Sequence, residues 1–336
     1  MCGAVIVGVI ANPASGRDIR RLVAGASVFG NADKAGMVLR LLAGLGATGV
    51  ERVLMMPAAD GLSVTLERQL RARDGTQRLP ALEVLPMTLT GTADDSVAAT
   101  ERMCARAVAA IVVLGGDGTH RVVAQTCGDV PLCALSTGTN NVFPQMREST
   151  VAGLATGLFA TGRVGAETAL KRNDALAVTV AGRVEHALVD VAVTPERFVG
   201  ARALWRADDV SELFVTFADP GAIGLSAVAG LLRPHAHGVH VTLAAPGAAQ
   251  LTLQVPLAPG LIVPVGIAGS RTLQPHEEVA LDPAAGCLAL DGERTLERTP
   301  ADSVTVQLTS GPLTIDVDAV MQQAAQDATF VQPRRA

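Results

Sequence analysis

The sequence predicts an N-terminal α/β domain with a Rossmann-like parallel sheet, followed by a C-terminal β-rich domain. Over the first 145 residues, apolar runs of strand length alternate with segments of helical period, which is typical of a parallel sheet with crossover helices. Beyond residue 165, short strands interrupted by Gly, Pro and Asp replace this alternation. The chain has 336 residues, 49% apolar and 18% charged, and is therefore large and apolar enough to bury two cores.

Five apolar runs in the first half have the length and composition of buried strands. They lie at residues 4–11, 52–56, 81–85, 110–114 and 131–135. The segments between them carry apolar residues on one helical face, as Val38, Leu41 and Leu45 do. The same spacing recurs at Leu62, Leu66, Leu70, Val97, Cys104 and Val108. We assign residues 1–150 to an α/β domain and expect a helix over 151–161 to follow it.

The second half predicts mainly strands. A hairpin is expected from strands at 175–180 and 184–193, joined by the turn Ala181–Gly182. Helical patterns occur at 221–232 and at 318–326. The remaining predicted strands are 239–243, 251–255, 261–265, 278–281, 287–290 and 303–308. We therefore assign 165–310 to a β-rich domain, and 311–336 to a C-terminal strand and helix that pack back on the body.

Charge and composition exclude several classes of partner. The 27 basic and 32 acidic residues give a net charge of −5. The chain therefore lacks the excess of positive charge that attracts nucleic acid or anionic lipid. No apolar run approaches the roughly 18 residues of a membrane span. The five cysteines form no Cys-x-x-Cys pair and the N-terminus lacks signal-peptide features, so we expect a cytoplasmic protein. The only lysines are Lys34 and Lys171, so any chemistry that needs a lysine has two candidates.

The most informative segment is the glycine-rich turn Gly115-Gly116-Asp117-Gly118-Thr119, which follows a buried strand and precedes a helical pattern. Such a turn exposes backbone N–H groups and a helix N-terminus at the carboxyl edge of a parallel sheet, where phosphate binds well. Asp117 within an anion site suggests a role in holding Mg²⁺ or in taking a proton from an attacking hydroxyl. The alternative is an ordinary turn in which Asp117 is the helix N-cap.

Two further polar loops follow predicted strands and should lie at the same edge of the sheet. The first is Asn12-Pro-Ala-Ser15-Gly, and the second comprises residues 136–141, with the sequence STGTNN. Their side-chain donors and glycine N–H groups suit phosphate and ribose oxygens, although each loop taken alone is also ordinary turn chemistry. The candidate ligands in the second loop are Thr137, Gly138, Thr139 and Asn140.

Other catalytic motifs are absent. The sequence contains no P-loop motif. The Gly-x-Gly-x-x-Gly dinucleotide fingerprint is also missing, because Arg121 stands where the third glycine after Gly116 and Gly118 is required. Residues 224–228 depart from Gly-x-Ser-x-Gly at the last position, which argues against an α/β-hydrolase. His235, His237 and His240 could ligate a transition metal, but their segment is typical of a solvated loop that enters a strand, and we favour that interpretation.

The glycine-rich turn and the loop at Asn12 resemble motifs of the superfamily of NAD kinases, diacylglycerol kinases and their relatives. The resemblance covers nearly the whole chain. Residues 290–294 (LDGER) resemble the C-terminal DGQ turn of NAD kinases, and residues 219–226 take the place of their glycine-rich loop. Within the superfamily, the sequence resembles the AcoX group, ATP-NAD kinase-like proteins associated with acetoin-utilisation gene clusters. That resemblance is carried by residues 115–121 (GGDGTHR), 136–144 (STGTNNVFP), 200–205 (GARALW) and 223–230 (IGLSAVAG).

This resemblance implies an NAD kinase-like fold with a C-terminal β-sandwich, a homo-oligomer, and the cofactors ATP and Mg²⁺. It implies that Asp117 is the catalytic carboxylate, with a possible contact to the metal of Mg-ATP. The implied phosphate and nucleotide ligands are Asn12, Ser15, Gly115, Gly116, Gly118, Thr119, Thr137, Gly138, Thr139 and Asn140. The implied residues of the acceptor side are Asp190, Gly224, Ser226 and Asp291.

The sequence departs from NAD kinases on the acceptor side. Their Asn-Glu pair, which binds the dinucleotide, corresponds here to Val189-Asp190, and the chain contains no tyrosine. We therefore expect an ATP-dependent kinase that phosphorylates a hydroxyl of NAD or of a smaller hydroxylated metabolite, in NADP biosynthesis or acetoin catabolism. The alternative is a nucleotide-binding sensor or accessory protein without turnover. A nicotinamide-dependent oxidoreductase is disfavoured, because the fingerprint is missing.

Overall fold

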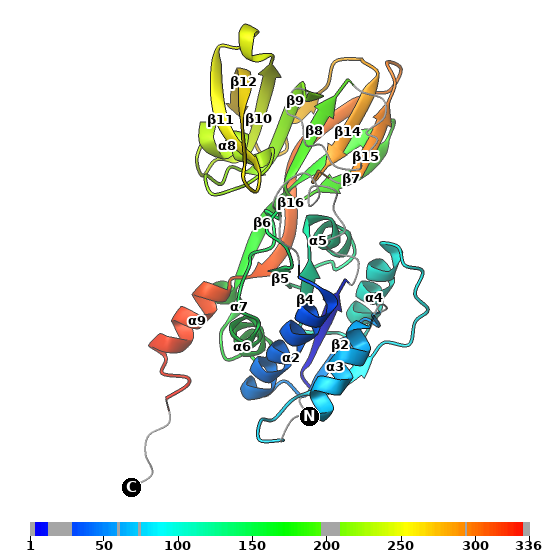
Figure 1. Cartoon of the computed structure of the whole chain (residues 1–336), viewed down its shortest axis with the longest axis vertical. Coiled ribbons are helices and arrows are strands. Elements are labelled where there is room, and N and C mark those ends of the chain that lie inside the picture. The colour runs from blue at the N-terminus through cyan, green and yellow to red at the C-terminus, as the bar shows by residue number, and fades with distance from the viewer. Residues whose placement is uncertain are drawn as a thin grey trace.

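The computed structural model describes residues 4–12, 29–58, 61–72, 75–195, 209–292 and 294–331. Five parallel strands form the lower part of the larger sheet in Figure 1, in the order β3-β2-β1-β4-β5. Their bounds are β1 Ile6–Ala11, β2 Arg52–Met55, β3 Ala81–Val84, β4 Ala110–Gly115 and β5 Leu132–Ser136. The five strands predicted from the first half are therefore confirmed, with ends that differ by one or two residues.

Helices cover both faces of the parallel strands. The first face carries α2 (Asn31–Thr48), α3 (Leu62–Arg71), α6 (Ser149–Ala160) and α9 (Val317–Gln326). The other carries α4 (Asp94–Ala105) and α5 (Asp117–Ala124), while α7 (Ala166–Ala169) leads into the second half. Side chains alternate across β1, so that Val7 and Val9 join the first core and Ile10 joins the second. No helix within the described part of the chain is long and apolar enough to span a membrane.

Two long antiparallel strands join the two halves. They are β6 (Leu170–Val180) and β16 (Val304–Ile315), which pair from Leu170 and Ile315 at one end to Val180 and Val304 at the other. The lower end of β16 pairs in parallel with β5, through Thr314 and Leu132. Figure 1 shows this β6–β16 ribbon running from the parallel strands into the β-rich half. The larger sheet is thus continuous through both halves of the molecule.

The β-rich half is a sandwich. The upper part of the larger sheet adds β7 (Arg183–Ala187) and β13 (Glu278–Ala280) to the ribbon. It packs against a second sheet, ordered β11-β12-β10-β9-β8-β14-β15, with Phe214 and Leu288 in the shared core. The strands of that sheet are β8 Asp190–Thr194, β9 Glu212–Phe217, β10 His237–Ala244, β11 Leu251–Ala258, β12 Leu261–Thr272, β14 Gly286–Leu290 and β15 Arg294–Arg298. The other face of the second sheet packs against α8 (Ser226–Leu232), and a 3-10 turn, η2 (Pro246–Ala248), precedes β11.

The structure confirms the two-part fold class but corrects several elements in the second half. The predicted strand at 184–193 is two strands, β7 and β8, which belong to different sheets because the chain turns at Leu188 and Val189. The helix predicted at 221–232 begins only at Ser226, and β16 extends seven residues beyond the predicted end at Leu308, to Ile315. Sequence reasoning missed β9 and β15 entirely.

Helices α2 and α6 pack closely because glycines stand at their contact. A Cβ atom on Gly44 would lie 2.4 Å from the carbonyl oxygen of Thr150, and one on Gly153 would lie 2.5 Å from that of Leu41. Backbone atoms cannot move aside as a flexible side chain can, so each glycine is required by the short distance between the helices.

We expect Gly44→Ala to lower the free energy of unfolding by about 1–3 kcal/mol, because the added methyl forces the two helices apart. The matched control is Gly36→Ala on the same helix, where the nearest atom to a new Cβ is the flexible end of Arg40 at 3.4 Å. Replacement of a helical glycine there should stabilise the protein by up to about 1 kcal/mol. Urea unfolding measures both, and equal stabilities for the two variants would contradict the packing argument.

Candidate functional site

The carboxyl edge of the parallel sheet brings together the glycine-rich turn, the loop after β5 and Asn12, which is the one described residue of the first polar loop. Strands β1, β4 and β5 are neighbours, with Ala11 opposite Leu114 and Gly115 opposite Ser136. The loops that follow are also tied together: Asn12 N–H donates to Leu114 O, and Thr137 N–H donates to Gly115 O, both at 3.2 Å. Ser15 and residues 200–205 lie outside the described residues.

Asp117 begins helix α5 but does not cap it. The N-cap is Gly116, in an extended conformation and without a side-chain cap bond. The Asp117 carboxylate instead accepts hydrogen bonds from the backbone N–H groups of Val142, at 3.1 Å to each oxygen, and of Phe143, at 2.9 Å. The N-cap alternative is therefore wrong, and Asp117 holds the loop after β5 against the glycine-rich turn.

The glycines of this turn are required by close neighbours. A Cβ atom on Gly115 would lie 2.7 Å from Cβ of Thr119, and one on Gly116 would lie 2.9 Å from Oδ1 of Asn141. Nδ2 of Asn141 donates in turn to Ser136 Oγ at 2.7 Å, which closes the loop after β5 on itself. The turn and this loop form one packed unit at the sheet edge.

Lys34 is a member of this site that the motif analysis did not include. Its side chain is 1% exposed, and Nζ donates to the carbonyl oxygen of Asn12 at 3.0 Å. Asn12 Nδ2 donates to Oγ1 of Thr119, also at 3.0 Å. An ammonium group in this position brings positive charge to the edge of the sheet where the phosphate ligands were predicted. The rarity of lysine in the chain was the only sequence signal that pointed to Lys34.

His120 lies directly beneath the turn. The ring is fully buried, and Nδ1 makes a hydrogen bond of 2.8 Å with the carbonyl oxygen of Gly116. The ring packs 5.8 Å from that of Phe143, and no partner for Nε2 occurs within the described structure. Burial lowers the pKa of His120 to about 4, partly opposed by the carbonyl groups of Gly116 and Val113. His120 is therefore a neutral group that supports the turn from below.

Asp291 joins the two halves instead of facing an acceptor. Its carboxylate accepts hydrogen bonds from the N–H groups of Leu188, Val189 and Asp190, at 2.8–3.3 Å. Arg121 of α5 donates to the carbonyl oxygen of Leu290 at 2.6 Å and lies 3.4 Å from the carboxylate. Burial raises the pKa of Asp291, whereas Arg121 and the three amides act in the opposite direction. The expected acceptor residue is thus enclosed within the protein.

A cleft of about 170 Å³ lies where the loop after β5 meets the β-rich half. Its lining includes Phe143, whose N–H group bonds to Asp117, and Val189, for which the sequence resemblance implied a loss of the dinucleotide-binding asparagine. Of the four expected acceptor residues, none is part of this lining. Asp190 and Ser226 are buried, and Gly224 N–H donates to the carbonyl oxygen of Pro256.

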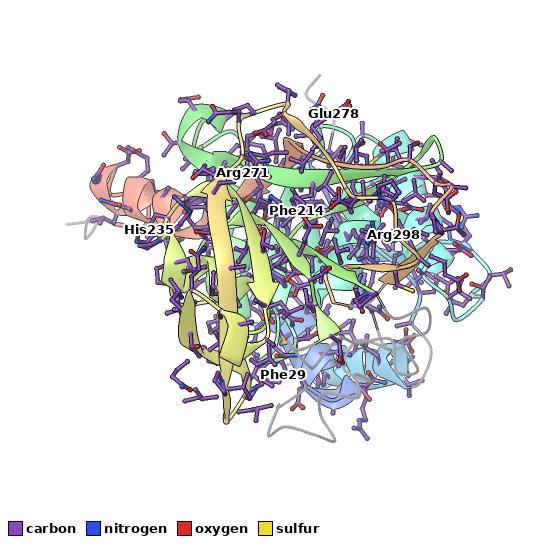
Figure 2. All side chains as sticks on the ribbon, turned by 90° about the horizontal axis from the view of Figure 1, so that it is seen from above. Phe29, Phe214, His235, Arg271, Glu278 and Arg298 are labelled. Carbon is purple, nitrogen blue, oxygen red and sulfur yellow. The ribbon has the colours of Figure 1, made fainter. Side chains whose placement is uncertain are left out.

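A second pocket of about 460 Å³ lies between the start of α2 and the loop after β5. Ser136, Phe29 and Met37 line it together with Arg40 and Arg147. Sequence reasoning did not predict it, because its wall is formed by residues from three separate segments. Figure 2 labels Phe29, which lies beside the described start of α2.

The three histidines do not converge on a metal. His237 bonds to Asp174 at 2.5 Å, whereas His240 bonds to Glu212 at 2.8 Å and stacks on Phe214. Among the described residues, no group of three or more His, Cys, Asp or Glu side chains could hold a metal ion.

Comparison with known proteins agrees with this geometry. Residues 7–164 match the family model of the ATP-NAD kinase N-terminal domain, so the fold and the glycine-rich turn define an NAD kinase-like protein. Residues 143–311 match the model of the acetoin catabolism protein X C-terminal domain. A relative named Acetoin catabolism protein X, from Cupriavidus necator, is 48% identical over 334 residues, covering 96% of this chain and 93% of the relative. The chain belongs to the acetoin catabolism protein X family.

Because the pKa of His120 is about 4 in the folded protein, well below the ordinary value of about 6.5, folding favours the neutral ring. This stabilisation is complete above about pH 6.5 and is lost as the pH falls toward 4, by roughly 3 kcal/mol in total. His120→Gln should flatten this loss, and the control His186→Gln should retain it. Urea unfolding at pH 7, 5.5 and 4.5 measures the slopes, and equal slopes for wild type and His120→Gln would refute the assignment.

Removal of Arg121 should leave the buried Asp291 carboxylate without its cation, so Arg121→Met should cost about 3–5 kcal/mol of stability. Asp291→Asn should also destabilise the protein, and the double variant should cost clearly less than the two single losses combined. A double-mutant cycle by chemical denaturation tests this. The control Arg271→Met breaks an exposed pair with Glu277 and should change stability by less than about 1 kcal/mol. Additive losses would argue against a coupled pair.

Proposed function

We propose that the protein is an ATP-dependent phosphotransferase that moves the γ-phosphoryl group to a hydroxyl of NAD or of a smaller hydroxylated metabolite. The observation that carries this proposal is the packed glycine-rich turn at the sheet edge, with Asp117 bonded to the loop after β5. Phosphoryl transfer requires mainly positioning and electrostatic stabilisation, which such a preorganised turn supplies.

The donor side fits a nucleoside triphosphate. Gly115 and Gly116 keep the turn compact, because Cβ atoms there would collide with Thr119 and Asn141, and the buried Lys34 brings a cation to the same edge. In the proposed site, backbone N–H groups of residues 116–118 hold the phosphates, while Asn12 and Thr119 keep the turn in place. Mg²⁺ would neutralise the phosphate charge, and Asp117, which belongs to the turn, is the carboxylate that would contact it. The pocket at the start of α2 has room for the base and sugar.

The accessory-protein alternative retains support from one contact. A carboxylate at position 117 is useful to a protein that only binds nucleotide, because it anchors the amides of Val142 and Phe143 whether or not a hydroxyl reacts. The relative's name refers to acetoin catabolism and to no reaction. Measurement of turnover therefore decides between an enzyme and a nucleotide-binding protein.

The decisive assay supplies purified protein with ATP, Mg²⁺ and either NAD or a panel of small hydroxylated metabolites that includes acetoin. We expect an ATP-dependent phosphorylated product, and we expect Asp117→Asn to reduce its rate at least 100-fold with nucleotide affinity changed much less. The matched control is Asp302→Asn, which removes a carboxylate that also bonds to a backbone N–H, at Thr299 in a distant turn. Nucleotide binding without product for any acceptor would favour the accessory role.

A further inference from the structure

The cleft between the two halves contains chemistry that the proposed function leaves unassigned. Strand β6 contributes Lys171 and Asp174, β9 contributes Phe217 and β10 contributes His237. Its wall is joined to the glycine-rich turn, because Phe143 lines the cleft and donates its N–H to Asp117. A molecule in this cleft would therefore lie beside the segment that Asp117 holds.

His237 and Asp174 form a dyad suited to proton transfer. Nδ1 of His237 bonds to Oδ2 of Asp174 at 2.5 Å, although the two residues are 63 positions apart in the sequence. A carboxylate on Nδ1 fixes the tautomer that carries its proton there, which leaves Nε2 as an acceptor. Within the described part of the chain, Nε2 has no hydrogen-bond partner of its own. The side chain remains 63% exposed, so a ligand can reach it.

Lys171 supplies a positive charge to the same cleft. Its Nζ lies 5.6 Å from the centroid of the Phe217 ring and forms no ion pair with any described residue. Arg172, the other cation of the lining, instead pairs with Asp129 at 3.4 Å. The Phe217 ring also lies 5.0 Å from that of His237, so one small molecule can contact both Lys171 and His237.

The size and walls of the cleft restrict its ligand. A volume of about 170 Å³ lies below the roughly 300 Å³ at which sites for cofactor-sized molecules begin. Leu188, Val189 and Phe143 form apolar walls, next to which an ion pair with Lys171 is less screened by water. Two carboxylates also line the cleft, but Asp174 bonds to His237 and Asp219 accepts the N–H group of Gly221 at 2.8 Å. With Lys171 as its unpaired cation among the described residues, the cleft suits a small anion better than a dinucleotide.

We propose that this cleft is the acceptor site and binds a small hydroxylated anion, with Lys171 as its counterion and Nε2 of His237 as the base. The inference rests on the proposed phosphoryl transfer. In the reaction, the acceptor oxygen bonds to the γ-phosphorus of Mg-ATP and its proton passes to Nε2. The bond from the γ-phosphorus to the β–γ bridging oxygen breaks, and ADP leaves with that electron pair. Asp174 is the positioning residue that orients the imidazole.

Calorimetry on the full chain, with Mg²⁺ and ADP present, tests the binding step. The probes are glycerate, a hydroxycarboxylate; glycerol 3-phosphate, a phosphomonoester; the neutral butane-2,3-diol; and NAD. We expect one of the two anions to bind best, and the preferred anion identifies the charged group. Lys171→Met should weaken its binding at least tenfold and Lys171→Arg should retain most of it. Arg271→Met, a half-exposed cation on β12 that Figure 2 labels, should leave it unchanged.

Three results would overturn the anion site: neither anion binds, the neutral diol or NAD binds as well as the anions, or Lys171→Met has no effect. None of these results depends on turnover. An anion that binds through Lys171 but is never phosphorylated would therefore contradict the proposed function and the base role while leaving the anion site established.

The base role is tested by steady-state kinetics with the preferred acceptor. His237→Gln should lower kcat at least 100-fold while KM and the calorimetric affinity change less than threefold, because proton transfer is lost and binding is kept. Asp174→Asn should lower kcat in the same way, since the wrong tautomer then prevails. An unchanged kcat in His237→Gln, in a variant with wild-type thermal stability, would refute the base.

Discussion

The β6–β16 ribbon is the constraint on which the rest of the structure depends. One end of β16 pairs with β5 in the parallel sheet and the other end lies in the core of the sandwich. Since the paired strands cannot slide past one another without breaking the ladder, the two halves are held at a fixed position. The segment of β6 at the crossing carries Lys171 and Asp174, so the ribbon also supplies the charged groups of the cleft.

Two buried carboxylates hold loops in place through backbone amides, and one of them, Asp291, also reinforces the link between the halves. Asp117 holds the loop after β5, and Asp291 holds the turn between β7 and β8 while Arg121 reaches across from α5. Each carboxylate is followed by a glycine, and each joins segments that are distant in the sequence. Hydrogen bonds from several N–H groups offset the cost of burying the charge, so the loops stay ordered before any ligand binds.

The donor and acceptor sides of the proposed reaction differ in chemistry. The donor side consists of glycines, amide groups and the enclosed Lys34, which suit a large polyanion that contacts mainly the backbone. The acceptor side is a small cleft with an accessible lysine and a histidine oriented by Asp174. Val189, an apolar residue, lines the cleft beside Leu188. This division is consistent with a retained donor site and an altered acceptor.

The sequence by itself determined the parallel half of the fold and the place of its glycine-rich turn. Continuous apolar runs predict the buried strands, and Gly115 and Gly116 mark a turn that larger residues cannot occupy. Only the tertiary structure decided the second half, where β9 and the full length of β16 are set by pairing with strands distant in the sequence. The same holds for the site: the burial of Lys34, the anchoring role of Asp291 and the pairing of His237 with Asp174 arise between residues 22 to 103 positions apart. The local pattern of apolar and polar residues cannot predict such contacts, because they form only when the sheets have packed.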